Sequence, residues 1–281
     1  MNKILCVTCL RDFYILQRQI ESFRLYLSEN HEIIYIVEDV DPTNWFQLWN
    51  DYEYNHSNLK NKISIILANQ LIPDYLKKIS GWHRQQILKL YGVMAQNQTC
   101  TVIDSKNFLI DYWDNNNRLI ERGDQLVDRS TPNTYETVIL PVYEKIVGIT
   151  VDKINSLVTP IDLDPDVITE GINNWPSDFL KWWRDSSLTY GWQSEFYLYY
   201  LWYVKQNRNT LMREYRIRNV WNDNFAECMY ILKKADLEKI EWVGIRANIP
   251  NTWDNLLKEQ MLEWLNSYGL VGKWNLIDLG K

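Results

Sequence analysis

The chain has 281 residues, with 30 Lys and Arg against 36 Asp and Glu and a formal net charge of −6. This acidic balance argues against nucleic acid as a partner, because binding to nucleic acid depends on cationic contacts with phosphate groups. Hydrophobic residues make up 46% of the chain and charged residues 23%, which excludes disordered and collagen-like classes. The 14 Trp and 18 Tyr stand out, since aromatic rings pack cores and also stack on sugars.

The first 110 residues alternate between predicted strands and helices. Leu16, Ile20, Phe23 and Leu27 are spaced by four, three and four residues, which predicts a helix. The strands are expected at Lys3–Leu10, Glu32–Val37, Lys62–Ala68 and Thr99–Asp104, a short helix at Trp45–Trp49 and a strong helix from Gly81 to Asn97. Alternation with short links predicts an α/β fold with a doubly wound, mainly parallel sheet.

The second part is less regular and rich in helices. Trp192–Lys205 is apolar nearly all round and is predicted to be a buried helix, and Asn251–Tyr268 has an amphipathic pattern. Strand-like segments lie near Leu157–Ile161 and Glu241–Arg246. With no clear linker or internal repeat, residues 1–115 and 116–281 are expected to be two halves of one continuous domain.

The apolar segments are short. The longest run, Phe196–Val204, cannot cross a bilayer, which takes about 20 residues. No small-residue cleavage site follows the apolar residues at the N-terminus. We therefore expect a cytoplasmic protein with no transmembrane segment.

The four cysteines point to no redox or zinc site. Cys6 and Cys9 form a C-x-x-C pair, but they lie in a predicted strand, where residues three apart face opposite sides. No second pair and no nearby His pair completes a zinc site. Reduced, structural cysteines are expected at Cys6, Cys9, Cys100 and Cys228.

Polar residues follow three of the predicted strands. In open parallel sheets, ligands bind at the carboxyl ends of the strands. An Arg and a Lys among several acids favour an anionic ligand with hydroxyl groups, although each group alone could be a cap or a solvated loop. The residues concerned are Thr8, Arg11 and Asp12 after the first strand, Glu38 and Asp39 after the second, and Asp104, Ser105, Lys106 and Asn107 after the fourth.

The helix that begins at Gly81 carries a polar stripe. At about 100° per residue, Trp82, Gln85, Gln86 and Lys89 fall within one arc, and apolar residues fill the other side. If this stripe meets the sheet edge, it offers hydrogen-bond donors for phosphate and sugar oxygens and a ring for stacking. The alternative is a solvent-facing stripe.

These residues resemble a known family. The string Gly-Trp-His-Arg-Gln-Gln-Ile-Leu-Lys-Leu at 81–90, followed by Val-Ile-Asp-Ser-Lys-Asn at 102–107, is similar to the uncharacterised DUF6492 group of glycosyltransferase-like proteins. Val-Thr-Cys-Leu-Arg-Asp at 7–12 and Ser-Glu-Phe-Tyr-Leu-Tyr at 194–199 fit it too. The resemblance implies a GT-A-like fold and transfer of a sugar from a nucleotide donor. The first half would then bind the nucleotide sugar and the second half the acceptor.

The resemblance also raises the question of a metal. GT-A enzymes usually hold a divalent cation, Mn²⁺ or Mg²⁺, with an Asp-x-Asp motif at the end of the fourth strand and often with a late His. Here the motif position is Asp104-Ser105-Lys106, and the segment expected to carry the His has Arg246. We hypothesise that Lys106, Lys89 and Arg246 replace the cation. The alternatives are a metal held by Asp104 alone with water, and loss of catalysis.

Glu195 opens the predicted buried helix. It is a candidate general base or acceptor ligand, and equally a first-turn carboxylate favoured by the helix dipole. Asp185 is a weaker candidate because Arg184 adjoins it. A sugar-stacking acceptor platform could form from Trp175, Trp182, Trp183 and Trp192, although packing is the expected role of most of them.

These observations lead to one functional hypothesis with one alternative. A glycosyltransferase would move a sugar from a nucleotide-sugar donor to a glycan or other hydroxyl acceptor. Its donor contacts would be Thr8, Arg11, Asp12, Asp39, Trp82, Gln85, Gln86, Lys89 and Arg246, and its catalytic residues Asp104, Lys106 and Glu195. The alternative is a non-catalytic nucleotide- or glycan-binding protein with the same fold.

Overall fold

The computed structural model describes most of the first 207 residues and short segments beyond them. The described residues are 1–39, 41–55, 59–114, 120–121, 124–155, 159–191, 193–207, 213–214, 217–220, 242–245, 259, 263–264, 266–268 and 270.

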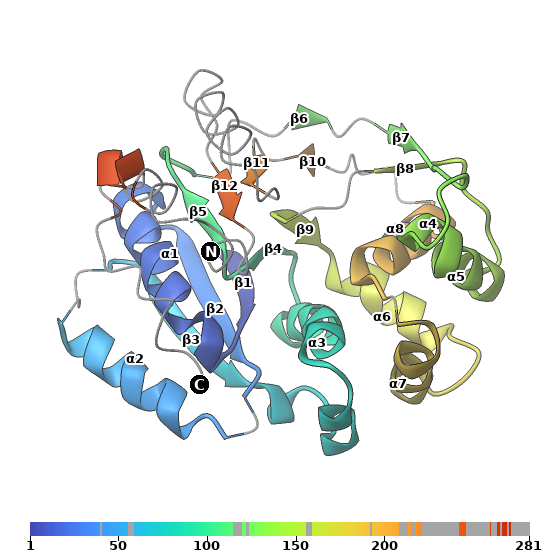
Figure 1. The fold of residues 1–281 in the computed structure, drawn as a ribbon, viewed down its shortest axis with the longest axis horizontal. Coiled ribbons are helices and arrows are strands. Elements are labelled where there is room, and N and C mark those ends of the chain that lie inside the picture. Colours follow the sequence, from blue (N-terminus) through green and yellow to red (C-terminus); the bar gives the residue numbers. More distant parts are fainter. Residues whose placement is uncertain are drawn as a thin grey trace.

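A five-stranded sheet forms the centre of the molecule, with the strand order β3-β2-β1-β4-β9 (Figure 1). Strands β1 (Asn2–Thr8), β2 (His31–Val37), β3 (Lys62–Leu67) and β4 (Cys100–Asp104) are parallel, and β9 (Ile161–Leu163) is antiparallel to β4. The chain moves outward from β1 to β3 and then returns to the other side of β1. The switch in strand order therefore lies between β1 and β4, which is where open α/β sheets bind ligands.

Helices cover both faces of this sheet (Figure 1). Ile4 and Cys6 of β1 pack with α1 (Phe13–Tyr26) and α2 (Thr43–Asn55), whereas Leu5 and Val7 pack with α3 (Gly81–Gln96). Successive residues of a strand point to opposite faces, so a strand covered on both sides is apolar throughout. The near-continuous apolar run at the N-terminus has this cause.

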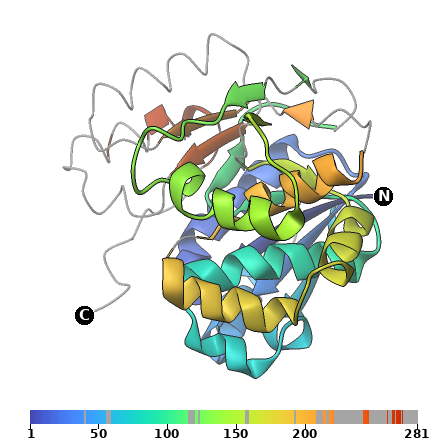
Figure 2. The ribbon, with the colours of Figure 1, turned by 90° about the vertical axis from the view of Figure 1, so that its right-hand side faces the viewer.

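The second half adds α4 (Tyr135–Val138), α5 (Leu140–Val147), α6 (Pro165–Asn173), α7 (Phe179–Tyr190) and α8 (Glu195–Lys205). Helices α6 and α8 pack against α3 and against each other. The turned view in Figure 2 shows α7 beside α3, and the indole N–H of Trp183 donates to His83 O at 3.2 Å. One hydrophobic core thus contains residues from both halves of the chain.

Short elements complete the described part. Strand β12 (Trp242–Ile245) lies between β5 (Asn107–Leu109) and β11 (Ile217–Val220). The pairs β6–β10 (Ile120–Glu121, Arg213–Glu214) and β7–β8 (Asp124–Leu126, Lys153–Asn155) form two small antiparallel ribbons. The 3₁₀ turns are η1 (Leu10–Asp12), η2 (Ala68–Gln70) and η3 (Asp74–Lys78).

The predicted elements of the first half are confirmed, with shifted ends. The first strand ends at Thr8 rather than Leu10, because the chain turns into η1, and Cys9 consequently lies outside the strand. The third strand ends at Leu67, the fourth begins at Cys100, and α2 is longer than the predicted Trp45–Trp49. Cys6, Cys9 and Cys100 carry free thiols, and burial raises the pKa of each, while Cys228 lies outside the described residues.

Two predictions in the second half need correction. Of the strand expected near Leu157–Ile161, residues 157 and 158 lie outside the described residues, Thr159 and Pro160 form a bend, and the strand in the structure is Ile161–Leu163, since proline has no N–H for a ladder. The helix expected from Trp192 begins at Glu195, where Ser194 Oγ accepts from the N–H of Tyr197 and caps it. The strand near Glu241–Arg246 is confirmed as β12, and most of Asn251–Tyr268 lies outside the described residues.

Within the described part, no helix is long and apolar enough to span a membrane.

Candidate functional site

The ends of β1 and β4 lie side by side at the switch point, where Val7 pairs with Asp104. The turn that follows β4 is held firmly. Asn107 Oδ1 accepts from the N–H of Asp104 at 2.7 Å, and Gln19 Nε2 donates to the carbonyls of Asp104 and Asn107 at 2.8 and 2.9 Å. The Asp104 side chain is therefore presented at the carboxyl edge of the sheet by a fixed backbone.

A buried charge cluster surrounds this side chain. Lys89 Nζ lies 2.9 Å from Asp104 Oδ1 and 3.0 Å from Glu195 Oε1, and the Lys89 and Glu195 side chains are only 5% and 1% exposed. We call these three residues the Lys89 cluster. Lys106 Nζ lies 3.5 Å from Asp104 Oδ2, and Thr159 Oγ1 donates to the same oxygen at 3.1 Å. Both carboxylate oxygens of Asp104 thus have a cationic neighbour.

The pKa values follow from burial and from this pairing. Burial opposes ionisation of Asp104, but Lys89 and Lys106 outweigh it and lower the Asp104 pKa well below its usual value. Burial would lower the pKa of Lys89, yet Asp104 and Glu195 raise it. Burial raises the pKa of Glu195, and Lys89 acts against that rise. Lys89 and Asp104 are therefore a charged pair at neutral pH.

The tip of β1 is tied to the same turn. Asp12 is buried and its Oδ2 accepts from Ser105 Oγ at 3.0 Å, while Arg11 is exposed, with its Nε 3.6 Å from Asp12 Oδ1. Thr8 Oγ1 is buried and has no hydrogen-bond partner among the described residues. A buried hydroxyl without a partner is costly.

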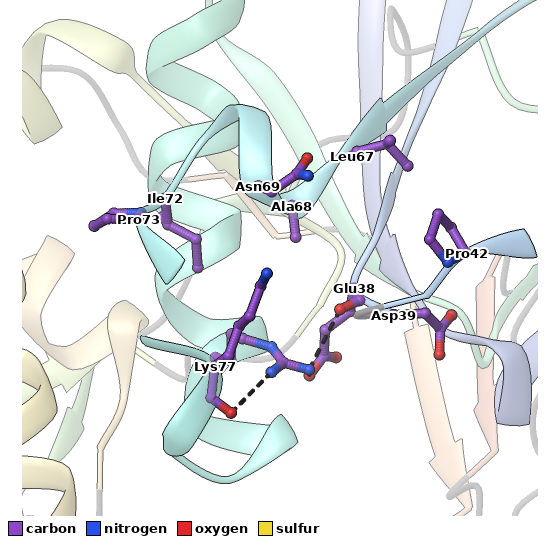
Figure 3. A pocket seen from close by; sticks show the side chains of 10 residues that line it. Glu38, Asp39, Pro42, Leu67, Ala68, Asn69, Ile72, Pro73 and Lys77 are labelled. Atoms are coloured by element: carbon purple, nitrogen blue, oxygen red, sulfur yellow. Dashed lines mark hydrogen bonds and ion pairs between the residues drawn. The ribbon is translucent and has the colours of Figure 1, made fainter. Parts of the chain in front are cut away.

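A second polar group lies at the tip of β2. Arg84 Nη2 is 2.9 Å from Glu38 Oε1, the Gln85 side chain also bonds to Glu38, and Asp39 Oδ2 accepts from the N–H of Leu10 at 2.7 Å. Burial raises the pKa of Glu38 to about 7 and raises that of Asp39. Figure 3 shows the pocket here, lined by Glu38, Asp39, Pro42, Leu67, Ala68, Asn69, Ile72, Pro73, Lys77 and Arg84.

The polar stripe of α3 joins these two groups. Gln85 reaches the β2 tip through Glu38, and Lys89 reaches the β4 tip through Asp104. Gln86 is buried like Lys89, whereas Trp82 is 41% exposed. The structure thus brings the predicted residues of the first, second and fourth strand tips to one edge of the sheet along one helix.

The remaining predicted residues lie partly in this site and partly outside it. The acceptor platform is wrong for Trp175 and Trp183, which are buried in the helical core, and Trp182 is half-buried against Trp175. Glu195 is fully buried beside Lys89. Asp185 lies in an ion pair with Arg184 on α7. Arg246 and Trp192 lie outside the described residues.

Three residues of the site were missed. Arg84 and Thr159 contact the predicted acids, and Tyr135 lies against Trp82. Arg84 is in the same helix as the stripe and could have been found as a cationic partner for the acids Glu38 and Asp39 at the second strand tip. Thr159 and Tyr135 lie on segments with no pattern that points to the strand tips.

A divalent cation does not fit Asp104. Its two carboxylate oxygens already contact the ammonium groups of Lys89 and Lys106, and Lys cannot bind a cation while protonated. In the part of the chain that is described, no group of three or more His, Cys, Asp or Glu is placed to hold a metal ion. Oxygen-rich sites are what Mg²⁺ and Mn²⁺ require.

Comparison with known proteins identifies the fold. No family model matches the chain, so its likeness to the DUF6492 group stays a prediction, and no curated protein matches either. The galactosyltransferase LgtC, solved with donor and acceptor sugar analogues, superposes with a TM-score of 0.51 at 10% identity, over 97% of this chain and 98% of LgtC. The chain therefore has the GT-A glycosyltransferase fold that the sequence predicted.

Two further solved structures are more distantly similar. The bifunctional glycosyltransferase WbbM gives a TM-score of 0.47 at 12% identity, over 86% of this chain and 45% of WbbM. The glycosyltransferase GlyE of Streptococcus pneumoniae TIGR4 also gives 0.47, at 10% identity, over 99% of this chain and 63% of GlyE. This chain thus spans less than half of WbbM and less than two thirds of GlyE.

Proposed function

We propose that this protein is a glycosyltransferase that moves a sugar from a nucleotide-sugar donor to a glycan or other hydroxyl acceptor, without a divalent cation at Asp104. The proposal rests on one observation above all. At the switch point of a GT-A fold, the carboxylate in the usual metal position has Lys89 on one oxygen and Lys106 on the other. The likeness of residues 81–90 and 102–107 to the DUF6492 group supports the same reaction.

The chemistry explains why cations belong there. When a glycosyl group leaves a nucleotide sugar, the departing diphosphate gains negative charge, and a metal ion or a fixed cation must stabilise it. The Lys89 cluster has one cation and two carboxylates. The Lys89 side chain is buried, and its ammonium group contacts Asp104 and Glu195, so we do not assign it to the ligand. Lys106 is more exposed and its contact with Asp104 is longer. We assign the contact with the diphosphate to Lys106 and the fixing of Asp104 to Lys89.

The positions of the other predicted residues are consistent with these roles of Lys106 and Lys89. Asp39 lines the pocket of Figure 3 and would contact the nucleoside, with Thr8, Arg11 and Asp12 at the neighbouring strand tip. Glu195, being fully buried, is assigned to holding Lys89 and not to deprotonating the acceptor.

The test is donor turnover with and without metal. Purified protein is incubated with a panel of nucleotide sugars, in EDTA and in Mn²⁺, and the released nucleoside diphosphate is measured. We expect turnover in EDTA, reduced at least about tenfold by Lys106→Ala and largely retained by Lys106→Arg; about tenfold corresponds to roughly 1.4 kcal/mol of barrier. The matched control is Lys60→Ala, an exposed lysine whose partner is Glu29.

Two results would contradict the proposal. Turnover that requires Mn²⁺ would reject cation replacement by lysine. Binding of a nucleoside diphosphate without turnover of any donor would favour the alternative, a non-catalytic binding protein. The observation that favours this alternative is Lys106 in the place of the second carboxylate of the motif. A GT-A fold without that carboxylate could bind a nucleotide without transferring the sugar.

A further inference from the structure

Three aromatic rings from three different elements lie in a row beside the Lys89 cluster, the first pair tilted by 43° and the second pair stacked. Trp82 lies in the first turn of α3, Tyr135 begins α4, and Tyr197 lies in the first turn of α8. The ring centroids of Trp82 and Tyr135 are 6.1 Å apart, and those of Tyr135 and Tyr197 are 5.8 Å apart with nearly parallel planes. We call these three residues the aromatic ladder.

The outer ring of the ladder is exposed, which packing does not explain. Trp82 is 41% exposed, whereas every other tryptophan in the described part of the chain is buried or half-buried. Tyr135 and Tyr197 behind it are half-buried. Exposing a large ring that rests on a second ring costs hydrophobic free energy, so an exposed stack of this kind is typical of a binding surface.

The ladder leads toward the reacting centre of the proposed function. Trp82 and Lys89 are seven residues apart, which places them on the same side of α3 and about 10 Å apart along it. Tyr135, the middle ring, lies near Glu195, and burial together with that carboxylate raises the pKa of the Tyr135 hydroxyl. The ladder thus begins at the surface with Trp82, and its middle ring lies near the buried carboxylate of the cluster.

The ladder lies on a different side of α3 from the pocket at the β2 tip. Arg84 points to Glu38 and lines that pocket, and Gly81 lies next to Glu38 as well. Trp82 is about 200° around the helix from Arg84, and its ring partner Tyr135 belongs to the second half of the chain. A nucleoside in the pocket and a ligand on the ladder would therefore approach Asp104 from two directions.

A hydrogen-bonding group accompanies the rings. The hydroxyl of Tyr197 donates to Glu136 Oε1, and Glu136 is half-buried on α4 beside Tyr135. The exposed apolar face of Trp82, with a carboxylate further along the row of rings, suits a glycan, whose pyranose rings have an apolar C–H face and a rim of hydroxyl groups. A lipid chain would not use the carboxylate.

We propose that the aromatic ladder is the acceptor subsite, and that the acceptor is a glycan whose pyranose ring stacks on Trp82. This assignment rests on the proposed function, because the acceptor is the second substrate of that reaction. It moves Trp82 from the donor contacts expected from the sequence to the acceptor side, and it puts the stacking surface on α3, α4 and α8 instead of on the buried tryptophans around α7.

The test measures glycan binding without any donor. A panel of defined pyranose oligosaccharides is screened against the full chain by saturation-transfer NMR, and hits are titrated by calorimetry. We expect Trp82→Ala to weaken binding at least about tenfold and Trp82→Tyr to retain it within about threefold, because the second variant keeps a ring. The matched control is Tyr112→Ala, which removes another exposed aromatic ring and should leave glycan binding unchanged. Nucleoside diphosphate affinity, measured in parallel, should be the same in all variants.

Three outcomes would overturn the assignment. The first is that the wild-type protein binds no glycan of the panel. The second is that wild type and Trp82→Ala bind glycan equally well. The third is that Trp82→Ala loses nucleoside diphosphate binding, which would make the ring a donor contact. A circular-dichroism melt of each variant separates misfolding from loss of the ring. If glycan binding depends on Trp82 but no donor is turned over, the proposed sugar transfer is rejected and the ladder remains a glycan-binding site. The proposed function and the acceptor subsite can therefore be rejected independently.

Discussion

Lys89 holds together carboxylates from both halves of the chain. Asp104 comes from the sheet and Glu195 from α8, and each oxygen that faces Lys89 is within 3.0 Å of its ammonium group. Removing one partner of a buried ion pair is far more damaging than never having the pair, because it leaves an uncompensated charge in a poorly solvated place. Here a single substitution would take the ammonium group away from two buried carboxylates, although Asp104 would keep its contact with Lys106.

Replacing Lys89 should therefore destabilise the fold strongly. We expect Lys89→Met to lower the free energy of unfolding by about 3–5 kcal/mol, measured by urea denaturation at pH 7. Lys106→Met should cost less than about 1 kcal/mol, since Lys106 is more exposed and its contact with Asp104 is longer.

A double variant provides the check on this reasoning. Lys89→Met combined with Glu195→Gln removes the charge of one of the two carboxylates that faced Lys89. The double variant should therefore be more stable than Lys89→Met alone. If Lys89→Met is as stable as wild type, or if the second substitution gives no recovery, then the cluster is not a buried charge network of the kind inferred from its distances.

At the scale of elements, the packing of α6 against α8 depends on a glycine. A Cβ at Gly171 would lie 2.2 Å from Cδ2 of Trp202 and 2.5 Å from two more atoms of that ring. Trp202 is buried, and its ring contacts the rings of Trp175 and Phe179. Gly171 thus allows two helices that flank α3 to approach each other closely.

Gly171→Ala should destabilise the protein although alanine favours helix. The helix propensity gained is about 1 kcal/mol, whereas overpacking a core costs about 1–3 kcal/mol, and contacts as short as 2.2 Å with three ring atoms put the cost at the upper end. We expect a net loss of about 1–2 kcal/mol in urea denaturation. Glu170→Ala, at an exposed neighbouring position, should change stability by less than about 0.5 kcal/mol.

The ring itself can be tested by a mutant cycle. Trp202→Leu makes room for the methyl group, so Gly171→Ala should cost less in that background than in wild type. Equal costs in the two backgrounds would mean that the clash with Trp202 is not the cause of the loss.

At the scale of the whole molecule, a segment near residue 270 closes onto the first helix. Arg18 Nη1 donates to Leu270 O at 2.8 Å, and Tyr26 Oη donates to Tyr268 O at 2.7 Å. Arg18 and Leu270 are both buried, and burial lowers the pKa of Arg18 to about 10. Residues about 250 positions apart therefore share one part of the core.

Two truncations isolate this contact. A chain ending at residue 267 should be at least about 2 kcal/mol less stable than a chain ending at residue 270, because it loses one charged and one neutral hydrogen bond and the buried Leu270 side chain. Urea denaturation of both chains measures the difference. Equal stabilities would show that residues 268–270 do not contribute to the fold.

Local patterns were sufficient for the first half of the fold. A strand buried on both faces must be apolar throughout, and a helix on a sheet must repeat its apolar residues every three or four positions, so β1, β2, β3, β4, α1 and α3 could be predicted to within a few residues. Their ends were less certain, because a turn such as Leu10–Asp12 is chosen by tertiary contacts that include the bond from Leu10 N–H to Asp39.

Only the residues at the strand tips of the candidate site could be predicted, because the sheet topology places them together. Parallel strands end on one edge, so Thr8, Asp39 and Asp104 could be expected near one another from their positions alone. The partners of these residues could not, because Thr159 and Glu195 reach Asp104 and Lys89 through the packing of distant segments.

The sequence by itself determined that this chain builds a mainly parallel α/β sheet with acids and lysines at its carboxyl edge, because periodicity and strand direction are local properties. Only the tertiary structure decided that Lys89 is buried between two carboxylates while Trp82 stays exposed, although both belong to one helical stripe. The difference arises because burial is set by what packs over each turn of α3. Helix α8 lies over Lys89, whereas the packing of α4 and α7 at the first turn buries His83 and leaves the Trp82 ring partly exposed.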